Sequence, residues 1–227
     1  MTIRVFVPAD SSALSVGAVS LKKKIAAQAA ARGSAIELVR NGSRGLSWLE
    51  PLVEVATPAG RVAYGPVTVA DVPGLLDAGF LAGADHPLAL GLTDEIPYLK
   101  KQERLTFARV GITDPLSLAD YAAHGGFAGL RAALSLTPGE IVAAVTESGL
   151  RGRGGAAFPA GIKWQTVLAA AGDEKYVVCN ADEGDSGTFS DRLLLEGDPF
   201  CLIEGMLIAG LAVGARKGYI YLRSEYP

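Results

Sequence analysis

A glycine-rich stretch with basic and aromatic residues is the part of this sequence best suited to bind a ligand. Residues 149–164 read GLRGRGGAAFPAGIKW. Because glycine has no Cβ, its backbone N–H groups can approach a planar or anionic ligand closely. The glycines in question are Gly152, Gly154 and Gly155, and charge and stacking come from Arg153, Lys163 and Phe158. The pattern predicts a site for a ligand with a flat ring and a phosphate; a flexible linker is the alternative.

An acidic loop follows the apolar run 175–179, which we expect to be a buried strand. Residues 180–189 read NADEGDSGTF. In open α/β sheets, ligands bind at the carboxyl ends of strands. Carboxylates there can accept charge-assisted hydrogen bonds from sugar hydroxyls. A metal site and a solvated acidic turn are the competing interpretations, although the spacing does not match a calcium loop.

Together the two loops favour flavin mononucleotide (FMN) with room for a nicotinamide. Residues 149–164 and 179–185 resemble the FMN- and NADH-binding, 51 kDa-type subunits of respiratory complex I, a family with relatives in NAD-dependent formate dehydrogenases and NAD-reducing hydrogenases. The tail 218–227 fits the same family. Ser43, Ser47 and the segment 97–107 look most like the β subunit of soluble molybdenum formate dehydrogenases.

The resemblance implies an NAD-dependent oxidoreductase subunit of diaphorase type. Such a subunit exchanges hydride between NAD(H) and FMN and passes electrons to or from iron–sulfur clusters, here within a formate dehydrogenase with iron–sulfur and molybdenum subunits as partners. Complex I and NAD-reducing hydrogenase are the alternative settings. A 4Fe-4S cluster belongs to the full-length family, and its ligands are not in this chain.

The resemblance also assigns residues to roles. The cofactor-binding residues are Gly152, Arg153, Gly154, Gly155, Lys163, Asn180, Asp182, Glu183 and Gly184, and the catalytic residues facing the dinucleotide are Phe158 and Asp185. Two positions depart from the family. Ala157 stands where glycine is usual, and Asp185 stands where complex I members usually have glutamate.

The amino-terminal part predicts a small α/β domain. We expect a βαβ unit that is closed by a hairpin. The unit consists of a strand at 3–7, a helix from about 16 to 32 and a second apolar run at 36–40, and the hairpin pairs 52–55 with 61–64. With residues 41–55, this arrangement resembles a thioredoxin-like ferredoxin domain. Ser43 and Ser47 occupy the places of two cysteines, so we predict a retained fold without the two-iron cluster. An unrelated α/β domain is the alternative.

The fold class is therefore α/β, with a thioredoxin-like domain followed by a partial, Rossmann-like parallel-sheet FMN-binding domain. The predicted divisions are 1–86, a connecting region 87–134, and 135–227. In the connecting region a short capped helix is expected from Asp114 to Tyr121. Thr137-Pro138-Gly139-Glu140 is a capping box that starts a helix, and a long apolar helix is expected to begin at Asp198. We expect the sequence to be a fragment carrying half of a site, so a non-catalytic scaffold or partial binding module is the alternative function.

The composition of the chain argues against several classes of binding partner and location. The net charge of -3 argues against nucleic acid. The longest apolar stretch, 200–215, contains Glu204 and predicts a buried helix rather than membrane insertion. No secretory signal is recognisable, which predicts a cytoplasmic protein. Cys179, Cys201, His86 and His124 are the only cysteines and histidines, so no metal site is expected and a thiol redox module is disfavoured.

Overall fold

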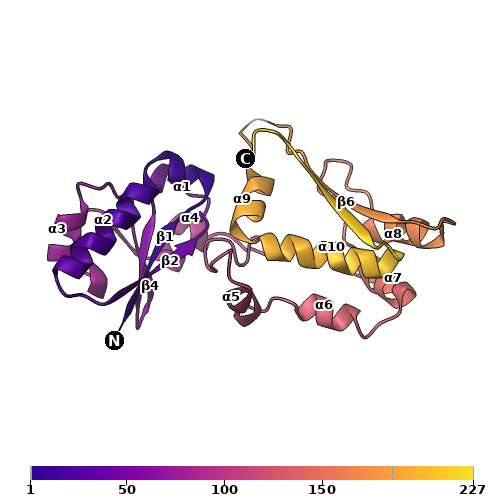
Figure 1. The fold of residues 1–227 in the computed structure, drawn as a ribbon, viewed down its shortest axis with the longest axis horizontal. Helices are drawn as coiled ribbons and strands as arrows, with labels where there is room; N and C mark the ends of the chain where they lie inside the picture. Colours follow the sequence, from indigo (N-terminus) through magenta and orange to yellow (C-terminus); the bar gives the residue numbers. More distant parts are fainter. Residues whose placement is uncertain (1, 186, 227) are drawn as a thin grey trace. The chain divides into compact units, whose positions relative to one another are not determined.

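The computed structural model describes residues 2–185 and 187–226, and the chain divides into two compact units (Figure 1). Unit 1 contains the residues up to Asp120 together with Leu193–Asp198. Unit 2 contains Tyr121–Arg192 and the residues from Pro199 onward. None of the helices in the described part of the chain is long and apolar enough to cross a bilayer.

Unit 1 is built on a mixed sheet with the strand order β2-β1-β3-β4-β5. Its strands are β1 (Ile3–Pro8), β2 (Ile36–Asn41), β3 (Val53–Thr57), β4 (Gly60–Tyr64) and β5 (Ala89–Leu92). Strand β1 is parallel to β2 and antiparallel to β3, and β3, β4 and β5 are successive antiparallel neighbours. The predicted βαβ unit closed by a hairpin is confirmed.

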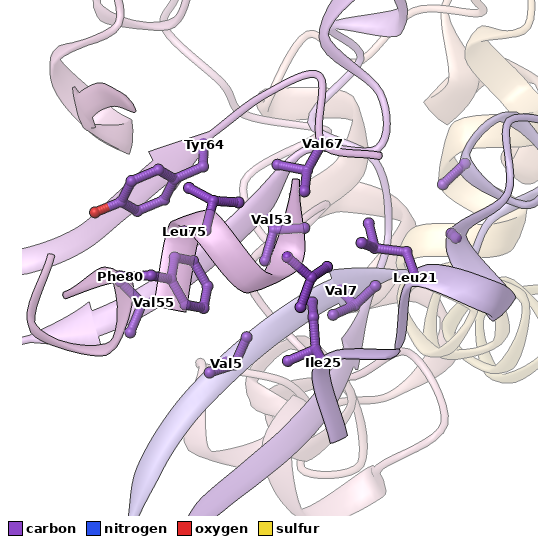
Figure 2. Packing of buried hydrophobic residues seen from close by; sticks show 13 residues of the cluster. Val5, Val7, Leu21, Ile25, Val53, Val55, Tyr64, Val67, Leu75 and Phe80 are labelled. Atoms are coloured by element: carbon purple, nitrogen blue, oxygen red, sulfur yellow. The ribbon is translucent and has the colours of Figure 1, made fainter. Parts of the chain in front are cut away.

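Short helices and one long helix complete unit 1. They are α1 (Ser11–Ser15), α2 (Ala18–Ala31), α3 (Val72–Asp77) and α4 (Pro97–Lys100). In Figure 2, Leu21 and Ile25 of α2 point toward valines of the central strands, among them Val7 and Val53. Tyr64 and Phe80 close the same cluster with an edge-to-face contact of 4.9 Å between ring centroids. The sheet and α2 therefore share one apolar core, as the alternation in residues 3–7 predicts.

A fully buried carboxylate lies in β3. Glu54 is 0% exposed, and its Oε1 accepts a hydrogen bond of 2.8 Å from Arg44 Nε. Its Oε2 accepts from Arg44 Nη2 at 3.1 Å and from Arg61 Nη1 at 3.0 Å. The Arg61 guanidinium also lies over the Phe6 ring, 3.5 Å from its centroid. One carboxylate thus holds two guanidinium groups, and through Arg44 it fixes the segment between β2 and β3.

The two serines at the predicted cysteine places have different surroundings. Ser43 is buried and donates from Oγ to Glu50 Oε1 at 2.6 Å, while Ser47 is exposed. Glu50 Oε2 accepts from the Leu52 amide at 2.9 Å. Burial, opposed by these hydrogen bonds, raises the pKa of Glu50 to about 7. A polar hydrogen-bonded network therefore occupies the segment.

Unit 2 combines helices with two strands. Its helices are α6 (Ala128–Ala133), α7 (Pro138–Glu147), α8 (Ala160–Ala169) and α10 (Pro199–Val213), and α5 (Leu118–Ala123) and α9 (Ser190–Gly197) each have residues in both units. Strands β6 (Tyr176–Ala181) and β7 (Lys217–Leu222) pair in parallel, with Tyr176 opposite Lys217. The predicted parallel crossover and the Thr137–Glu140 capping box are both confirmed.

A buried glutamate of α10 organises the beginning of α6. Glu204 accepts hydrogen bonds from the Tyr121 hydroxyl at 2.5 Å and from the backbone N–H groups of Phe127 and Leu130 at 2.7 and 2.8 Å. Phe127 has a φ of 63°, and its own side chain does not cap the helix. Glu204 therefore supplies the cap from a distant part of the sequence.

Three sequence predictions about local structure are wrong. The strand at 175–179 is not buried: Val178 is 61% exposed, because α10 packs against the other face, toward Val177. The helix expected to be buried at 200–215 is only partly covered, and Ile203 and Leu207 are exposed.

The third error concerns a helix boundary. The helix expected from Asp114 begins at Leu118, because Asp114 instead accepts the Leu116 N–H in a turn. The helix expected to begin at Asp198 is confirmed as α10, and α9 before it is a further helix about which the sequence analysis makes no prediction.

Replacing Glu54 with Gln should lower the free energy of unfolding by about 3–5 kcal/mol, because it removes the buried anion that pairs with two largely buried guanidinium groups. Urea unfolding followed by circular dichroism measures this. The control is Glu37→Gln, which breaks an exposed 3.4 Å pair with Arg4 and should cost less than about 1 kcal/mol. Equal effects of the two changes would contradict the structural importance of Glu54.

The pKa of Glu50 predicts a pH dependence of stability. Since the folded state raises this pKa from 4.5 to about 7, the folded protein binds the proton more tightly than the unfolded chain. Glu50 then contributes up to about 3 kcal/mol of stability below pH 4.5, and this contribution is lost as the pH rises to 7. Glu50→Gln should flatten the decline in unfolding free energy between pH 5 and 8. Parallel curves for the two proteins would rule this out.

Candidate functional site

The glycine-rich stretch forms a closed loop between α7 and α8. The Gly152 N–H donates to the Phe158 carbonyl at 2.9 Å, and the Ala160 N–H donates to the Leu150 carbonyl at 2.8 Å. Arg151 and Pro159 form an isolated antiparallel bridge. These backbone bonds give the loop a defined shape, so it is not a flexible linker.

One glycine of the stretch serves packing instead of ligand approach. A Cβ on Gly161 would lie 2.2 Å from Thr146 Oγ1 and 2.7 Å from Thr146 Cα. Helices α7 and α8 can therefore pack against each other only with glycine at this position. Sequence reasoning missed this role, because nothing in the local pattern points to Thr146 as the neighbour.

The tip of the loop is open on the side where a ligand would approach. A Cβ on Gly154 or Gly155 would have no heavy atom within 4 Å, and at Gly152 the nearest atom is the Phe158 carbonyl oxygen at 3.6 Å. Arg153 is exposed beside them. The chain thus presents backbone N–H groups and a cation with space around them, which fits a phosphate or a ring approaching closely.

Ala157 adopts a backbone conformation that favours glycine. Its φ is 48°, in the left-handed region where a Cβ is close to the following carbonyl. From the sequence, Ala157 stands where glycine is usual in the family that it resembles. The structure gives the physical reason: the turn before Phe158 requires a positive φ.

Phe158 and Lys163 are brought together at the end of the loop. The Lys163 Nζ lies 5.8 Å from the centroid of the Phe158 ring, and the Phe158 side chain is 45% exposed. Lys163 follows on the first turn of α8, so its position is set by the helix. A flat exposed ring with an ammonium group beside it can stack on an aromatic ligand and pair with an anion.

The acidic loop follows β6, as predicted. Asn180 Oδ1 accepts the Asp182 N–H at 3.1 Å, which turns the chain directly after the strand. The Asp182 and Asp185 side chains are exposed. Gly184 lies between them, and a Cβ at this position would have only Asp182 atoms within 4 Å. These groups remain available to donors from a ligand.

Glu183 behaves differently from its neighbours. Its carboxylate accepts hydrogen bonds from the Asp191 and Arg192 N–H groups at 2.9 and 3.1 Å, from Ser190 Oγ at 3.1 Å and from the Tyr226 hydroxyl at 2.7 Å. Partial burial acts to raise its pKa, but these hydrogen bonds outweigh burial and lower it. Glu183 therefore caps the beginning of α9.

Two residues of the tail support the acidic loop, and sequence reasoning missed them as functional residues. Besides the Tyr226 bond, an Arg223 Nη1 donates to the Glu183 carbonyl, and Arg223 also pairs with Glu225 at 2.9 Å. In the sequence, Arg223 and Tyr226 stand out only as members of the tail 218–227, which resembles the same family as the two loops. Their partner is some 40 residues away, so no local signal indicates the contact.

The structure does not join the two candidate loops directly. Within residues 2–185 and 187–226, no hydrogen bond or ion pair links residues 149–163 to residues 180–189. The same residues contain no group of three or more His, Cys, Asp or Glu side chains placed to hold a metal ion. Each loop presents its own ligand-binding groups.

Unit 2 is an α/β unit with a basic glycine-rich loop and an acidic loop, and the acidic loop lies at the carboxyl end of a parallel strand. Comparison with known proteins finds that residues 145–227 match the Nuo51 FMN-binding domain. This part of the chain is similar to that domain, and the match covers less than half of the chain.

Several relatives share the same region. The NADP-reducing hydrogenase subunit HndC of Solidesulfovibrio fructosivorans is 53% identical over 128 residues, which are 56% of this chain and 26% of that protein. The NAD-reducing hydrogenase HoxS subunit alpha of Cupriavidus necator is 50% identical over 93 residues, 41% of this chain and 15% of that protein. An NADH-quinone oxidoreductase chain of Rhizobium meliloti (strain 1021) is 51% identical over 125 residues, 55% of this chain and 30% of that protein. The matched segments thus span less than a third of each relative.

A solved structure aligns with nearly the whole chain. The NAD+-reducing [NiFe]-hydrogenase in its air-oxidized state covers 99% of this chain and 38% of its own, with a TM-score of 0.44 and 24% sequence identity.

Replacing Ala157 with Gly should raise the free energy of unfolding by about 0.5–1 kcal/mol. The change relieves the strain of alanine in the left-handed conformation, and this gain exceeds the larger conformational entropy that glycine loses on folding. The matched control is Ala156→Gly, at a neighbouring position with no positive φ, which should lower the free energy of unfolding by a similar amount. Chemical denaturation measures both. If both changes destabilise the protein alike, the strain assigned to Ala157 is absent.

Proposed function

We propose that this chain is part of a diaphorase-type electron-transfer subunit that exchanges hydride between NAD(H) and FMN and passes electrons to or from iron–sulfur clusters. The observation that carries the proposal is the open, basic glycine-rich loop with Phe158 and Lys163 at its end, lying within the matched FMN-binding domain. FMN supplies the redox chemistry when bound, because its ring accepts hydride as a pair of electrons and releases them singly.

The residues of this chain would bind and orient the cofactors. Lys163 would neutralise the FMN phosphate, and the amides of Gly152, Gly154 and Gly155, with Arg153 beside them, would approach the phosphate and ring closely. Phe158 would stack on the nicotinamide, and Asp185 would accept a hydrogen bond from the dinucleotide. The open space at the glycines and the exposure of Phe158 support this fit.

The acidic loop would hold the sugar portion of the ligands. Asn180 and Asp182, with Gly184 allowing close approach, would bind ribityl or ribose hydroxyls. The sequence predicts the same role for Glu183, but its carboxylate already accepts four hydrogen bonds within unit 2. We therefore propose that Glu183 positions the loop and α9, and that it contacts a ligand only through its backbone.

The finer assignment rests on the sequence resemblance. We propose a NAD-dependent formate dehydrogenase with iron–sulfur and molybdenum subunits as partners; the relatives' names, NADH-quinone oxidoreductase and hydrogenase, favour complex I or a hydrogenase as alternatives. The same proposal includes the divisions 1–86, 87–134 and 135–227 and the loss of the two-iron cluster. It also includes a 4Fe-4S cluster elsewhere in the full-length protein and a cytoplasmic location.

A second candidate function applies to the 227 residues taken alone. Apolar side chains on both strands of unit 2 are exposed, including Val178 at 61% and Ile220 at 48%. Exposed apolar surface of this kind marks an interaction face. Without whatever covers it, the chain would act as a scaffold or a partial cofactor-binding module and would not turn over NADH.

Flavin titration tests the proposal. Tryptophan and flavin fluorescence should report FMN binding, and Lys163→Gln should weaken it by about 1.5–3 kcal/mol, the value of a charge-assisted hydrogen bond. The affinity for riboflavin, which lacks the phosphate, should not change in the Lys163→Gln variant. Lys217→Gln serves as the matched control.

Phe158→Ala should weaken NADH binding to the FMN-loaded protein by about 0.5–1.5 kcal/mol. A folded chain that binds no flavin would favour the scaffold.

A further inference from the structure

Unit 1 contains a pocket that the proposed function does not use. It has a volume of about 360 Å³ and lies between α4 and the segment that follows it. Its apolar lining includes Leu99, Phe107 and Val110, and its charged lining includes Arg44, Lys100 and Arg104. The volume is within the range of small ligand sites, about 300–1,000 Å³, and an apolar floor beside cations fits an anion carried on an apolar body.

Arg104 is the cation in this pocket that lacks a carboxylate partner among the described residues. Its Nη2 donates to the Arg44 carbonyl at 2.8 Å and its Nε donates to Gln102 Oε1 at 2.8 Å. Partial burial, followed by the charge of Arg44, lowers the pKa of Arg104. The guanidinium is thus partly desolvated beside a second cation, a situation that an incoming carboxylate would relieve.

Nearby anions do not cancel this charge. Glu54 is shared between Arg44 and Arg61, so one negative charge serves two guanidinium groups. Lys100 pairs with Glu95, and Asp94 lies 3.9 Å from Arg44 with its side chain 92% exposed to solvent. The pocket therefore retains a surplus of positive charge at Arg104.

Large apolar side chains lie exposed next to the pocket. Trp48 and Tyr98 form an edge-to-face pair with ring centroids 5.2 Å apart, and they are 60% and 54% exposed. Tyr98 precedes Leu99 and Lys100 on α4. Leu105, directly after Arg104, is 83% exposed. Tryptophan, tyrosine and arginine together are typical of the residues that dominate protein interfaces.

We propose that this pocket and its aromatic rim form a docking surface for a protein partner that presents a carboxylate side chain beside an apolar one. The carboxylate would pair with Arg104, and the apolar neighbour would pack on Trp48 and Tyr98. An extended acidic segment can reach both features, whereas a free small anion would use only the pocket. The surface is independent of the flavin site.

A pair of peptides tests the docking surface on the full 227-residue chain. The probe is the blocked peptide acetyl-Gly-Leu-Glu-Leu-Gly-amide, and its neutral counterpart has glutamine in place of glutamate. We expect the acidic peptide to shift the NMR signals of the Arg104 Nε–H and the Trp48 indole N–H, and to bind at least about tenfold more tightly than the neutral one. Its affinity should fall as salt is raised.

Matched variants decide the role of Arg104. Arg104→Gln should reduce the affinity for the acidic peptide to that of the neutral peptide, whereas Lys101→Gln, which removes the same charge from an exposed position outside the pocket, should change it less than about twofold. Equal losses in the two variants would overturn the proposal, as would shifts confined to other residues. Acetate or inorganic phosphate producing the same shifts with equal affinity would show a small-anion site and would also overturn it.

Discussion

The buried carboxylate of Glu54 is the interaction on which unit 1 most depends. A charge at 0% exposure is tolerated only when it is fully paired, and here it pairs with guanidinium groups from two different segments. Arg44 comes from the connection between β2 and β3, and Arg61 comes from β4 and also donates to the Gly111 and Ile112 carbonyls. Three stretches of chain are therefore fixed around one side chain.

Carboxylates in unit 2 are used in a related way, with backbone N–H groups as their partners. Glu204 caps α6 and Glu183 caps α9, and each does so from a distant position in the sequence. The first turn of a helix leaves N–H groups without intrahelical partners, and its positive end favours an anion. The carboxylates of the acidic loop would repel one another. The charge of Glu183 is stabilised by the beginning of α9 and does not require a ligand.

The sequence predicts those features that depend on neighbouring residues. The helix started by Thr137 and the hairpin from Leu52 to Tyr64 follow from local capping and periodicity. The parallel pairing of β6 with β7 follows from the order strand, helix, strand along the chain. The glycine-rich loop is also recognisable, since its residue types are unusual by themselves. The roles of Gly161 and Glu183 could not be predicted, because they depend on contacts with Thr146 and with α9 that only the folded chain creates.

Unit 1 is discontinuous in sequence, since it includes Leu193–Asp198. A Cβ on Gly42 would lie 2.9 Å from the Gly197 Cα, and Arg109 pairs with the fully buried Asp198 side chain at 2.9 Å. The ribosome must therefore add about 80 residues after Asp120 before this unit has all of its parts. At about 5–20 residues per second, that interval lasts roughly 4–16 s. During this interval of synthesis, the amino-terminal unit lacks residues 193–198 and the contacts that they make with Gly42 and Arg109.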